Sequence, residues 1–324
     1  MTAFAGRLSE AARKLVLTPI NRLLNRLDAP VLVLVYHRVA TLASDPEMLA
    51  VTPANFRAQM KYLKDNFPLV RFEADWAGTP KPAIAVTFDD GYADNLLEAL
   101  PIVEELAVPA TFFVTTGNIG TGQEFWWHEL QRLILGTHKL PPHFDLGTGS
   151  WGTVTEVKRR VMYDGLVRLM NDATPRQRNE WLSRVRGWAE METAPNDRHR
   201  SMTLEELRIL AGSRLVTIGA HTVSHTRLAA LSSSGQKEEI MTSKQQLETW
   251  IGREIRVFSY PFGRRSDYTK ESMTLCREAG FIKAAANFPG QAHSWTEPFQ
   301  IPRHLVRDWP VELFAEKIRG FWTR

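Results

Sequence analysis

The sequence predicts an α/β fold, a distorted (β/α) barrel of about seven strands with a helical insertion. Short apolar runs rich in β-branched residues alternate along the 324-residue chain with segments of helical periodicity. Continuous apolar runs of this kind are typical of parallel strands buried on both faces. Between residues 117 and 200 the alternation stops, and helical patterns and turns take its place. This stretch is too long for a simple connecting loop, so it is read as an insertion.

The composition is that of a soluble globular protein, with 44% apolar and 23% charged residues. A formal net charge of +4 is too small to indicate a nucleic-acid partner. Cys276 is the only cysteine, which excludes a disulfide within the chain.

Residues 1–28 predict a basic amphipathic helix. Its apolar positions are interrupted by charges, so neither a signal peptide nor a membrane-spanning run is seen. Such a helix usually packs on its domain, and peripheral contact with a membrane surface is the alternative. We therefore expect a cytoplasmic protein, with the inner face of the membrane as the second choice. The interrupting charges are Arg7, Arg13, Lys14, Arg22 and Arg26.

The first part of the barrel is expected over residues 29–116. Apolar, β-rich runs predict strands at 31–36, 83–88 and 110–115, with a short one near 69–72. Helical spacing predicts helices over 55–67 and 95–106. Pro101 should bend the second helix or mark a new start.

The insertion, residues 117–200, should contain three helices, over 126–134, 157–170 and 175–191, with turns near 141–142 and 147–152. We expect it to border the mouth of the barrel. Trp181 and Trp188 are expected to pack in a core, the commoner use of tryptophan at helical spacing. Trp126 and Trp127 are adjacent, and adjacent helical residues do not share a face, so core and mouth both stay open for them.

The barrel should resume over residues 201–324. A capping box at Thr203 and Glu206 predicts a helix that ends near Gly212. Further helices are expected over 233–251, closed by Gly252, and over 266–279 and 310–318. The remaining strands are expected at 215–220, 255–260, 281–286 and 301–306.

Polar residues follow two of these strands directly. Asp89 and Asp90 end one strand, and adjacent carboxylates need a cation or a shared proton. The other strand runs into His221 and His225, whose imidazoles can reach one metal ion. With a carboxylate they would form a set of two histidines and one aspartate. Catalytic groups of such barrels follow the C-terminal ends of strands, so we expect a metal site there.

Three motifs in this order carry a family resemblance: Thr-Phe-Asp-Asp-Gly-Tyr at 87–92, His-Thr-Val-Ser-His at 221–225 and Ser-Tyr-Pro-Phe-Gly at 259–263. They resemble the first three motifs of the polysaccharide deacetylases, the family typified by the nodulation chitooligosaccharide deacetylase. The resemblance spans roughly residues 31–306 and implies a distorted barrel.

The resemblance also implies residue roles. Asp90, His221 and His225 would hold a divalent metal ion, Zn²⁺ first, with Co²⁺ or Ni²⁺ as alternatives. Asp89 would be the base that takes a proton from water. The backbone N–H of Phe262 would complete an oxyanion site.

The sequence departs from the common family pattern in two places. Ser259 stands where most members carry an arginine, and the late Leu-x-His motif that usually supplies the acid histidine is not found. A Tyr-His pair after the first strand resembles the branch of poly-N-acetylglucosamine deacetylases. We therefore expect His37 to be the general acid, with His293 and His304 as rivals. Arg303 is the candidate partner that orients Asp89.

The expected function is metal-dependent removal of N-acetyl groups from an N-acetylhexosamine in a polysaccharide, oligosaccharide or lipid-linked sugar. The expected partner is thus an N-acetylated glycan, and the oligomeric state stays open. One alternative is an amidohydrolase of the same fold that opens a cyclic amide or ureide, against which the two retained histidines argue. Another is a non-catalytic carbohydrate-binding protein, against which the intact Asp89 argues. Tyr92 and Tyr260 could line a sugar groove or belong to the core.

Overall fold

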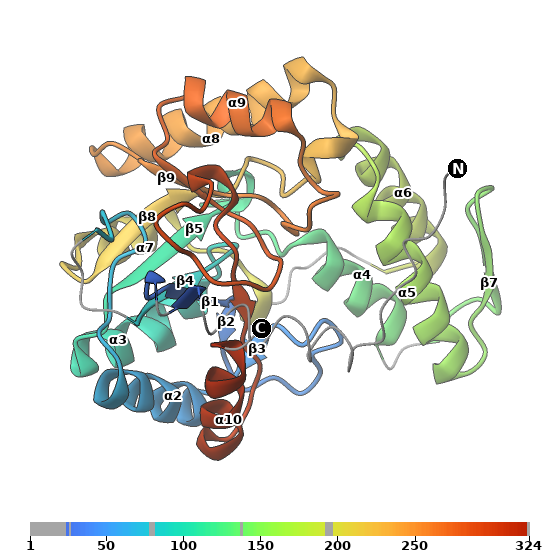
Figure 1. The fold of residues 1–324 in the computed structure, drawn as a ribbon. Coiled ribbons are helices and arrows are strands. Elements are labelled where there is room, and N and C mark those ends of the chain that lie inside the picture. Colours follow the sequence, from blue (N-terminus) through green and yellow to red (C-terminus); the bar gives the residue numbers. More distant parts are fainter. Residues whose placement is uncertain (1–23, 26, 78–81, 137–138, 192–196, 323–324) are drawn as a thin grey trace, which may run out of the picture.

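A seven-stranded parallel sheet forms the centre of the computed structural model, which describes residues 24–25, 27–77, 82–136, 139–191 and 197–322 (Figure 1). The strand order is β10-β9-β8-β5-β4-β1-β11. The strands are β1 (Val31–Tyr36), β4 (Ala83–Phe88), β5 (Ala110–Val114), β8 (Val216–Ala220), β9 (Val257–Ser259), β10 (Lys283–Ala285) and β11 (His304–Leu305). Each corresponds to a predicted run, although the last three are shorter than expected.

The two edges of this sheet meet through the segment that contains β11. His304 pairs with Leu34 of β1, and three residues earlier Ile301 forms a parallel bridge to Ala285 of β10. One short stretch of chain therefore touches both edge strands, and the sheet curls into a distorted barrel. The predicted fold class is confirmed.

Helices cover the outside of the sheet (Figure 1). They begin and end close to the predicted positions, since the sequence carries their caps: Thr203 forms a capping box, and Gly252 ends α8 in the left-handed region at φ 66°. Pro101 marks a new start, because a π-helix over Asn95–Ala99 gives way there to α3. The helices are α2 (Pro53–Asn66), α3 (Leu100–Leu106), α7 (Leu204–Gly212), α8 (Ser233–Ile251), α9 (Lys270–Glu278) and α10 (Val311–Phe321).

Some short elements differ from the predictions. The strand expected near 69–72 is only a bridge between Leu69 and Ile84. The helix expected from 266 begins at Lys270, because Thr269 caps it. Arg38–Val39 and Ala50–Val51 form an unpredicted two-stranded parallel pair, β2 and β3.

Alternation along the strands divides the core into two parts. Leu32, Ile84 and Phe112 belong to the large cluster under the helices. Their sequence neighbours Val33, Ala85 and Phe113 belong to the smaller cluster inside the barrel. The inward series continues past the strand ends to Asp89 on β4, His221 on β8 and, at the last residue of β9, Ser259. The period of two thus points these polar residues into the barrel mouth.

Residues between 117 and 200 pack beside the barrel (Figure 1). They form α4 (Trp126–Leu135), α5 (Glu156–Asn171) and α6 (Pro175–Ala189), with a hydrophobic cluster of their own. An antiparallel pair, β6 (His143–Asp145) and β7 (Ser150–Gly152), replaces the predicted succession of turns. Trp181 and Trp188 pack partly buried against this cluster, in line with their expected role. The exact extent of the insertion stays a prediction.

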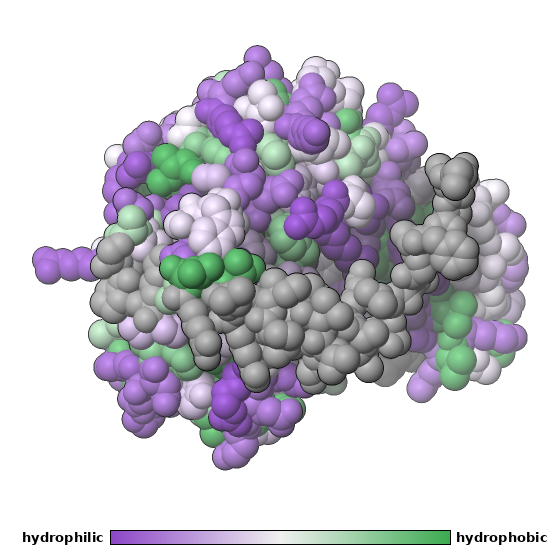
Figure 2. All heavy atoms as spheres, in the orientation of Figure 1, coloured by the Kyte–Doolittle hydropathy of each residue, from purple (hydrophilic) through white to green (hydrophobic). Residues whose placement is uncertain are grey.

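The predicted helix over residues 1–28 lies almost entirely outside the described residues. Within the described part of the chain, no helix combines the length and apolarity needed to cross a membrane. On the face seen in Figure 2, hydrophilic side chains predominate and hydrophobic ones form small patches.

Candidate metal and catalytic site

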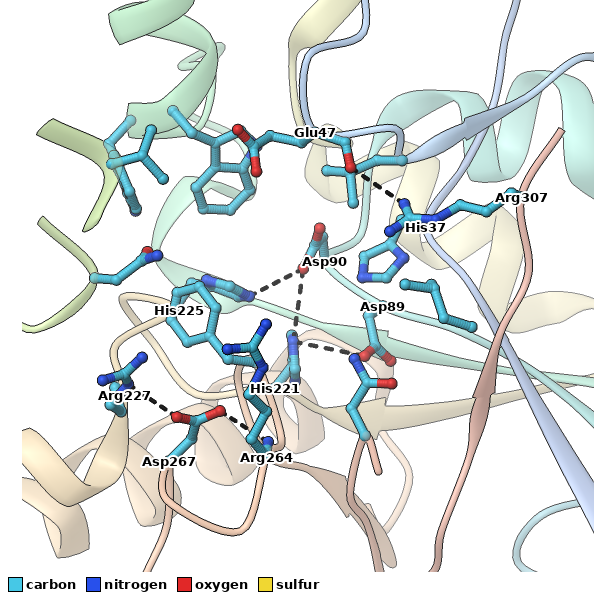
Figure 3. A pocket seen from close by; sticks show the side chains of 18 residues that line it. His37, Glu47, Asp89, Asp90, His221, His225, Arg227, Arg264, Asp267 and Arg307 are labelled. Atoms are coloured by element: carbon cyan, nitrogen blue, oxygen red, sulfur yellow. Dashed lines mark hydrogen bonds and ion pairs between the residues drawn. The ribbon is translucent and has the colours of Figure 1, made fainter. Parts of the chain in front are cut away.

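A cavity of about 260 Å³ opens at the C-terminal ends of the barrel strands, and we call it the strand-end cavity (Figure 3). Strand register explains which residues meet there. Tyr36 of β1 pairs with Phe88 of β4, so the next residues, His37 and Asp89, lie side by side. His37, Asp89, Asp90, His221, His225 and Phe262 all line this cavity, so the structure brings together every site residue predicted from the sequence.

Asp89 is held by Arg303 in a bidentate ion pair. The guanidinium Nη1 donates to Oδ1 at 2.8 Å and Nη2 donates to Oδ2 at 2.6 Å. Arg303 is 1% exposed and Asp89 is 3% exposed, so the pair is removed from solvent. The expectation that Arg303 orients Asp89 agrees with this geometry.

Ser259 connects the two halves of the site. Its hydroxyl accepts from Arg303 Nη2 at 2.9 Å and lies 3.3 Å from Asp89 Oδ2. Its carbonyl oxygen lies 2.7 Å from Nδ1 of His221. A carbonyl can only accept, so Nδ1 carries a proton and Nε2 of His221 is the ring nitrogen that faces Asp90.

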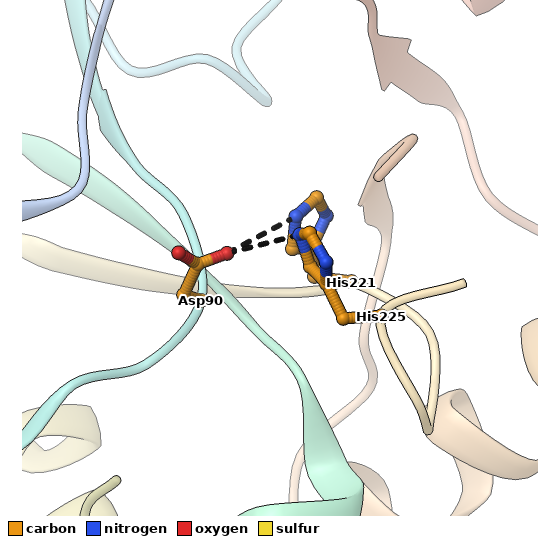
Figure 4. A group of neighbouring side chains, drawn as sticks. All are labelled: Asp90, His221 and His225. Carbon is orange, nitrogen blue, oxygen red and sulfur yellow. Dashed lines mark ion pairs between the residues drawn. The ribbon is translucent and has the colours of Figure 1, made fainter. Parts of the chain in front are cut away.

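Asp90, His221 and His225 converge on one point (Figure 4). Oδ1 of Asp90 lies 3.2 Å from Nε2 of His225 and 3.5 Å from Nε2 of His221. This buried oxygen accepts no well-formed hydrogen bond from any described residue. Three potential ligand atoms, all within 4.8 Å of one another, thus face each other. This donor set suits a divalent metal ion.

The backbone of the ligand loops adopts unusual conformations. Asp90, His225 and Phe262 have positive φ values of 79°, 50° and 61°. Non-glycine residues rarely adopt such angles, and they occur most often where function requires a particular orientation. Gly117 shows a second constraint: a Cβ there would lie 2.5 Å from the carbonyl oxygen of Val223, so only glycine lets the loops after β5 and β8 meet.

Both aspartates are ionised at neutral pH. Burial acts to raise the pKa of Asp89, but Arg303, His221 and His37 together outweigh it and the pKa is lowered. Burial also opposes ionisation of Asp90, yet His225 and His221 hold its pKa well below the usual value. Burial lowers the pKa of His37, against the opposing effect of Asp90 and Asp89.

Of the three histidines considered as acid, His37 alone lines the strand-end cavity, and its Nδ1 is buried without a partner among the described residues. His304 instead stacks on Phe321, with ring centroids 4.0 Å apart, and lies 2.9 Å from the Gly290 carbonyl oxygen. His293 lies 2.9 Å from the Asp28 carbonyl oxygen.

The two tyrosines considered for a sugar groove belong to the core. Tyr92 is fully buried, and its hydroxyl meets His128 Nε2 at 2.9 Å and the Trp127 indole N–H at 3.0 Å. Tyr260 is 1% exposed and donates to the carbonyl oxygen of Phe299. Neither lines the strand-end cavity, so of the two alternatives left open the structure supports the core.

Several cavity residues had no signal in the sequence. Glu47, Asn171 and Asn287 come from three distant segments and belong to no recognisable motif. Trp126 and Trp127 are both buried and both line the cavity, so the two alternatives held open for them are compatible. The indole of Trp127 lies against His225, with ring centroids 4.9 Å apart.

Fold and site together define a parallel α/β barrel with a buried Asp-His-His group and an arginine-held carboxylate at its strand ends. The polysaccharide deacetylase family model matches residues 77–159 and 186–281, and the chain belongs to this family. The resemblance carried by the motifs is confirmed.

Known proteins match this chain at low sequence identity. YxkH of Bacillus subtilis (strain 168) is 22% identical over 267 residues, which cover 80% of this chain and 65% of YxkH. The polysaccharide deacetylase BC0361 from Bacillus cereus superposes with a TM-score of 0.59 at 21% identity, over 90% of this chain and 69% of that one. The Streptococcus pyogenes deacetylase PplD, solved with acetate, superposes with a TM-score of 0.57 at 16% identity, over 89% of this chain and 98% of PplD. IcaB from Ammonifex degensii superposes with a TM-score of 0.56 at 16% identity, over 91% of this chain and 98% of IcaB.

Proposed function

We propose that this protein hydrolyses the N-acetyl group of an N-acetylhexosamine in a polysaccharide, oligosaccharide or lipid-linked sugar. One observation carries the proposal: an ionised, arginine-held Asp89 lies beside the Asp90, His221 and His225 group in one cavity. Hydrolysis of an amide needs a base for water, stabilisation of an oxyanion and an acid for the leaving amine. The cavity contains a candidate for each.

Asp90, His221 and His225 would hold a divalent cation, for which Zn²⁺ is our first choice. The facing ligand atoms and the Nδ1–H of His221, fixed on the Ser259 carbonyl, support this assignment. When bound, such an ion lowers the pKa of water and polarises a carbonyl group.

Asp89 would take the proton of the attacking water. Arg303 keeps this carboxylate ionised and fixes its plane, while Ser259 contacts the same oxygen as Nη2. The residue therefore needs no reorientation before it accepts a proton.

Phe262 and His37 would act on the acetyl oxygen and the amine. The Phe262 backbone N–H has no hydrogen-bond partner among the described residues, and Phe262 lines the cavity beside His225. This leaves a donor for a developing oxyanion. His37 lies next to Asp89 on the neighbouring strand and would protonate the departing amine.

Acetate release tests the proposal. Metal-loaded protein should release acetate from an N-acetylglucosamine oligomer, and Asp89→Asn should abolish release while metal remains bound. Asp65→Asn, at an exposed position of α2, is the matched control and should keep wild-type activity. Turnover of a cyclic amide or ureide without acetate release would favour the amidohydrolase alternative. Binding of the oligomer without any turnover would favour the carbohydrate-binding alternative.

A further inference from the structure

The loop between the two candidate ligand histidines is held from three sides, and we call residues 222–224 the histidine loop. Thr222 has a positive φ of 63°, a conformation that persists only with support from its surroundings. The segment after β5 supplies one side. The backbone N–H of Thr116 donates to the carbonyl oxygen of Thr222 at 3.1 Å, and that of Gly117 donates to the next carbonyl oxygen at 2.8 Å. These bonds fix the first part of the histidine loop.

Glu239 of α8 holds the histidine loop from the second side. Its Oε2 accepts from the backbone N–H groups of Val223 and Ser224 at 2.8 and 2.9 Å. Its Oε1 accepts from the Ser224 hydroxyl at 2.6 Å. Successive backbone N–H groups that point the same way form a concave site for an anion, and here a side chain of the protein occupies it. Glu239 is only 9% exposed, so water competes little for these three bonds.

Arg178 of α6 holds the histidine loop from the third side. It is 5% exposed, and its Nη2 donates to the Ser224 carbonyl oxygen at 2.7 Å. Burial lowers the pKa of Arg178 to about 10, although Glu239 opposes this shift, so the guanidinium remains a cation at neutral pH. A helix that packs beside the barrel thus reaches the histidine loop through one charged side chain.

The main-chain groups of Ser224 therefore lie between two opposite charges. Its N–H donates to the Glu239 carboxylate and its carbonyl oxygen accepts from the Arg178 guanidinium. Hydrogen bonds to ionised groups are roughly twice as strong as those between neutral groups. His225 follows Ser224 directly, and its Nε2 lies 3.2 Å from Oδ1 of Asp90 (Figure 4). A displacement of Ser224 would therefore move a candidate metal ligand.

We propose that Glu239 and Arg178 are positioning residues, which hold the histidine loop so that Nε2 of His225 faces the metal ion. This inference rests on the proposed function, since it assumes the metal site described there. It makes metal affinity depend on α6 and α8 as well as on the residues at the strand ends. Loss of a group that orients a ligand typically costs ten- to a hundredfold in metal affinity.

Metal affinity gives the first test. Glu239→Gln keeps the shape of the side chain but replaces one acceptor oxygen by an NH₂ group, which cannot accept. We expect the dissociation constant for Zn²⁺, measured by competition with a chelator, to rise about tenfold or more. Glu238→Gln, at the exposed neighbouring position of α8, should match the wild type. A purely structural role would lower Tm and leave the dissociation constant unchanged, and that result would overturn the proposal.

A long-range effect of charge predicts a different pattern. If Glu239 and Arg178 acted only through their charges, Arg178→Met would tighten Zn²⁺ binding. The double variant, whose net charge equals that of the wild type, would then bind as the wild type does. Positioning predicts instead that Arg178→Met weakens binding and that the double variant stays weak. Arg176→Met, at an exposed position of α6, is the control for the arginine. Tighter binding in Arg178→Met would overturn the proposal.

Bound Co²⁺ reports the arrangement of the ligands through its visible absorption spectrum. The spectrum should change in Glu239→Gln and in Arg178→Met, and stay unchanged in Glu238→Gln. Wild-type spectra in the first two variants would overturn the proposal. If Glu239→Gln fails to fold, Arg178→Met still tests the proposal, since it acts on the same loop from the opposite side. Metal binding without acetate release would count against the proposed function alone, so the two fail separately.

Discussion

Arg303 donates hydrogen bonds to both carboxylate oxygens of Asp89, although the two residues lie 214 positions apart. Arg303 precedes β11 and Asp89 follows β4, and β1 stands between these strands in the sheet. The guanidinium also donates to the Ala286 carbonyl and to Ser259 Oγ, which fixes its plane. Arg303, directly before β11, thus holds Asp89, and the hydroxyl of Ser259 contacts the same carboxylate.

Arg303→Lys is expected to lower kcat by about 10² while retaining bound metal. Lysine keeps the charge but cannot form the two parallel bonds that hold the Asp89 carboxylate. Removal of one partner of a buried pair costs about 3–5 kcal/mol, so the conservative change is preferred to Arg303→Met. Steady-state kinetics and metal analysis on the same preparation check this.

A wild-type kcat in Arg303→Lys would show that the orientation of Asp89 does not limit the reaction. Arg265→Lys provides the control, because Arg265 is exposed and bonds to Gln300 outside the site.

Metal removal should lower both activity and thermal stability. A ligand that binds only the native state stabilises it, by about 4 kcal/mol at a thousand times its dissociation constant. When protein freed of metal by a chelator is titrated with Zn²⁺, thermal unfolding should show a rise in Tm. His225→Ala should show little rise, while His143→Ala, an exposed histidine of β6, should respond as the wild type does. An equal rise in His225→Ala would exclude this residue as a ligand.

Much of the fold and the centre of the site could be predicted because short-range patterns encode them. Val31–Tyr36 and Ala83–Phe88 are continuous apolar runs, and the structure has strands with those same bounds. Asp90 and His221 follow strands in recognisable motifs. Asn171 and Arg178 come from helices whose docking depends on tertiary packing, so no local pattern announces that they reach a cavity.

The tyrosines show a limit of another kind. Tyr92 belongs to a motif, and the sequence left both the groove and the core open for it. The chain turns at Asp90 and Gly91, both at positive φ, and this turn points Tyr92 toward α4 instead. A sequence that lacks backbone angles cannot give the direction of a side chain after such a turn.

His37→Gln should lower kcat for glycan substrates by at least about 10², in the range that general acid catalysis contributes. His304 packs on Phe321 outside the cavity, so His304→Gln should change kcat little and should lower Tm instead. Kinetics and thermal unfolding of both variants test the assignment. The opposite ranking of the two kcat values would remove His37 from the reaction. An activated aryl ester should be less sensitive to His37→Gln, since its leaving group needs no proton.

His199 predicts a particular loss of stability in acid. Burial lowers its pKa to about 4, together with the neighbouring Arg38, whose Nη1 lies 2.7 Å from Nδ1. Asp45 opposes this shift and Arg198 adds to it, while the ring stacks on His128, itself buried with a lowered pKa. His199 in the unfolded chain binds a proton near pH 6.5, whereas native His199 binds it only near pH 4. Stability should therefore fall as the pH drops through this window.

His199→Asn should remove part of that slope. The free energy of unfolding, measured with urea between pH 7.5 and 4, should fall less steeply in the variant by up to about one proton. The amide can still accept from Arg38, so the comparison isolates the titration from the hydrogen bond. His143→Asn, at an exposed position of β6, should leave the wild-type slope unchanged. Identical slopes in His199→Asn and the wild type would mean that native His199 takes up its proton as readily as the unfolded chain does, and the assignment to His199 would be wrong.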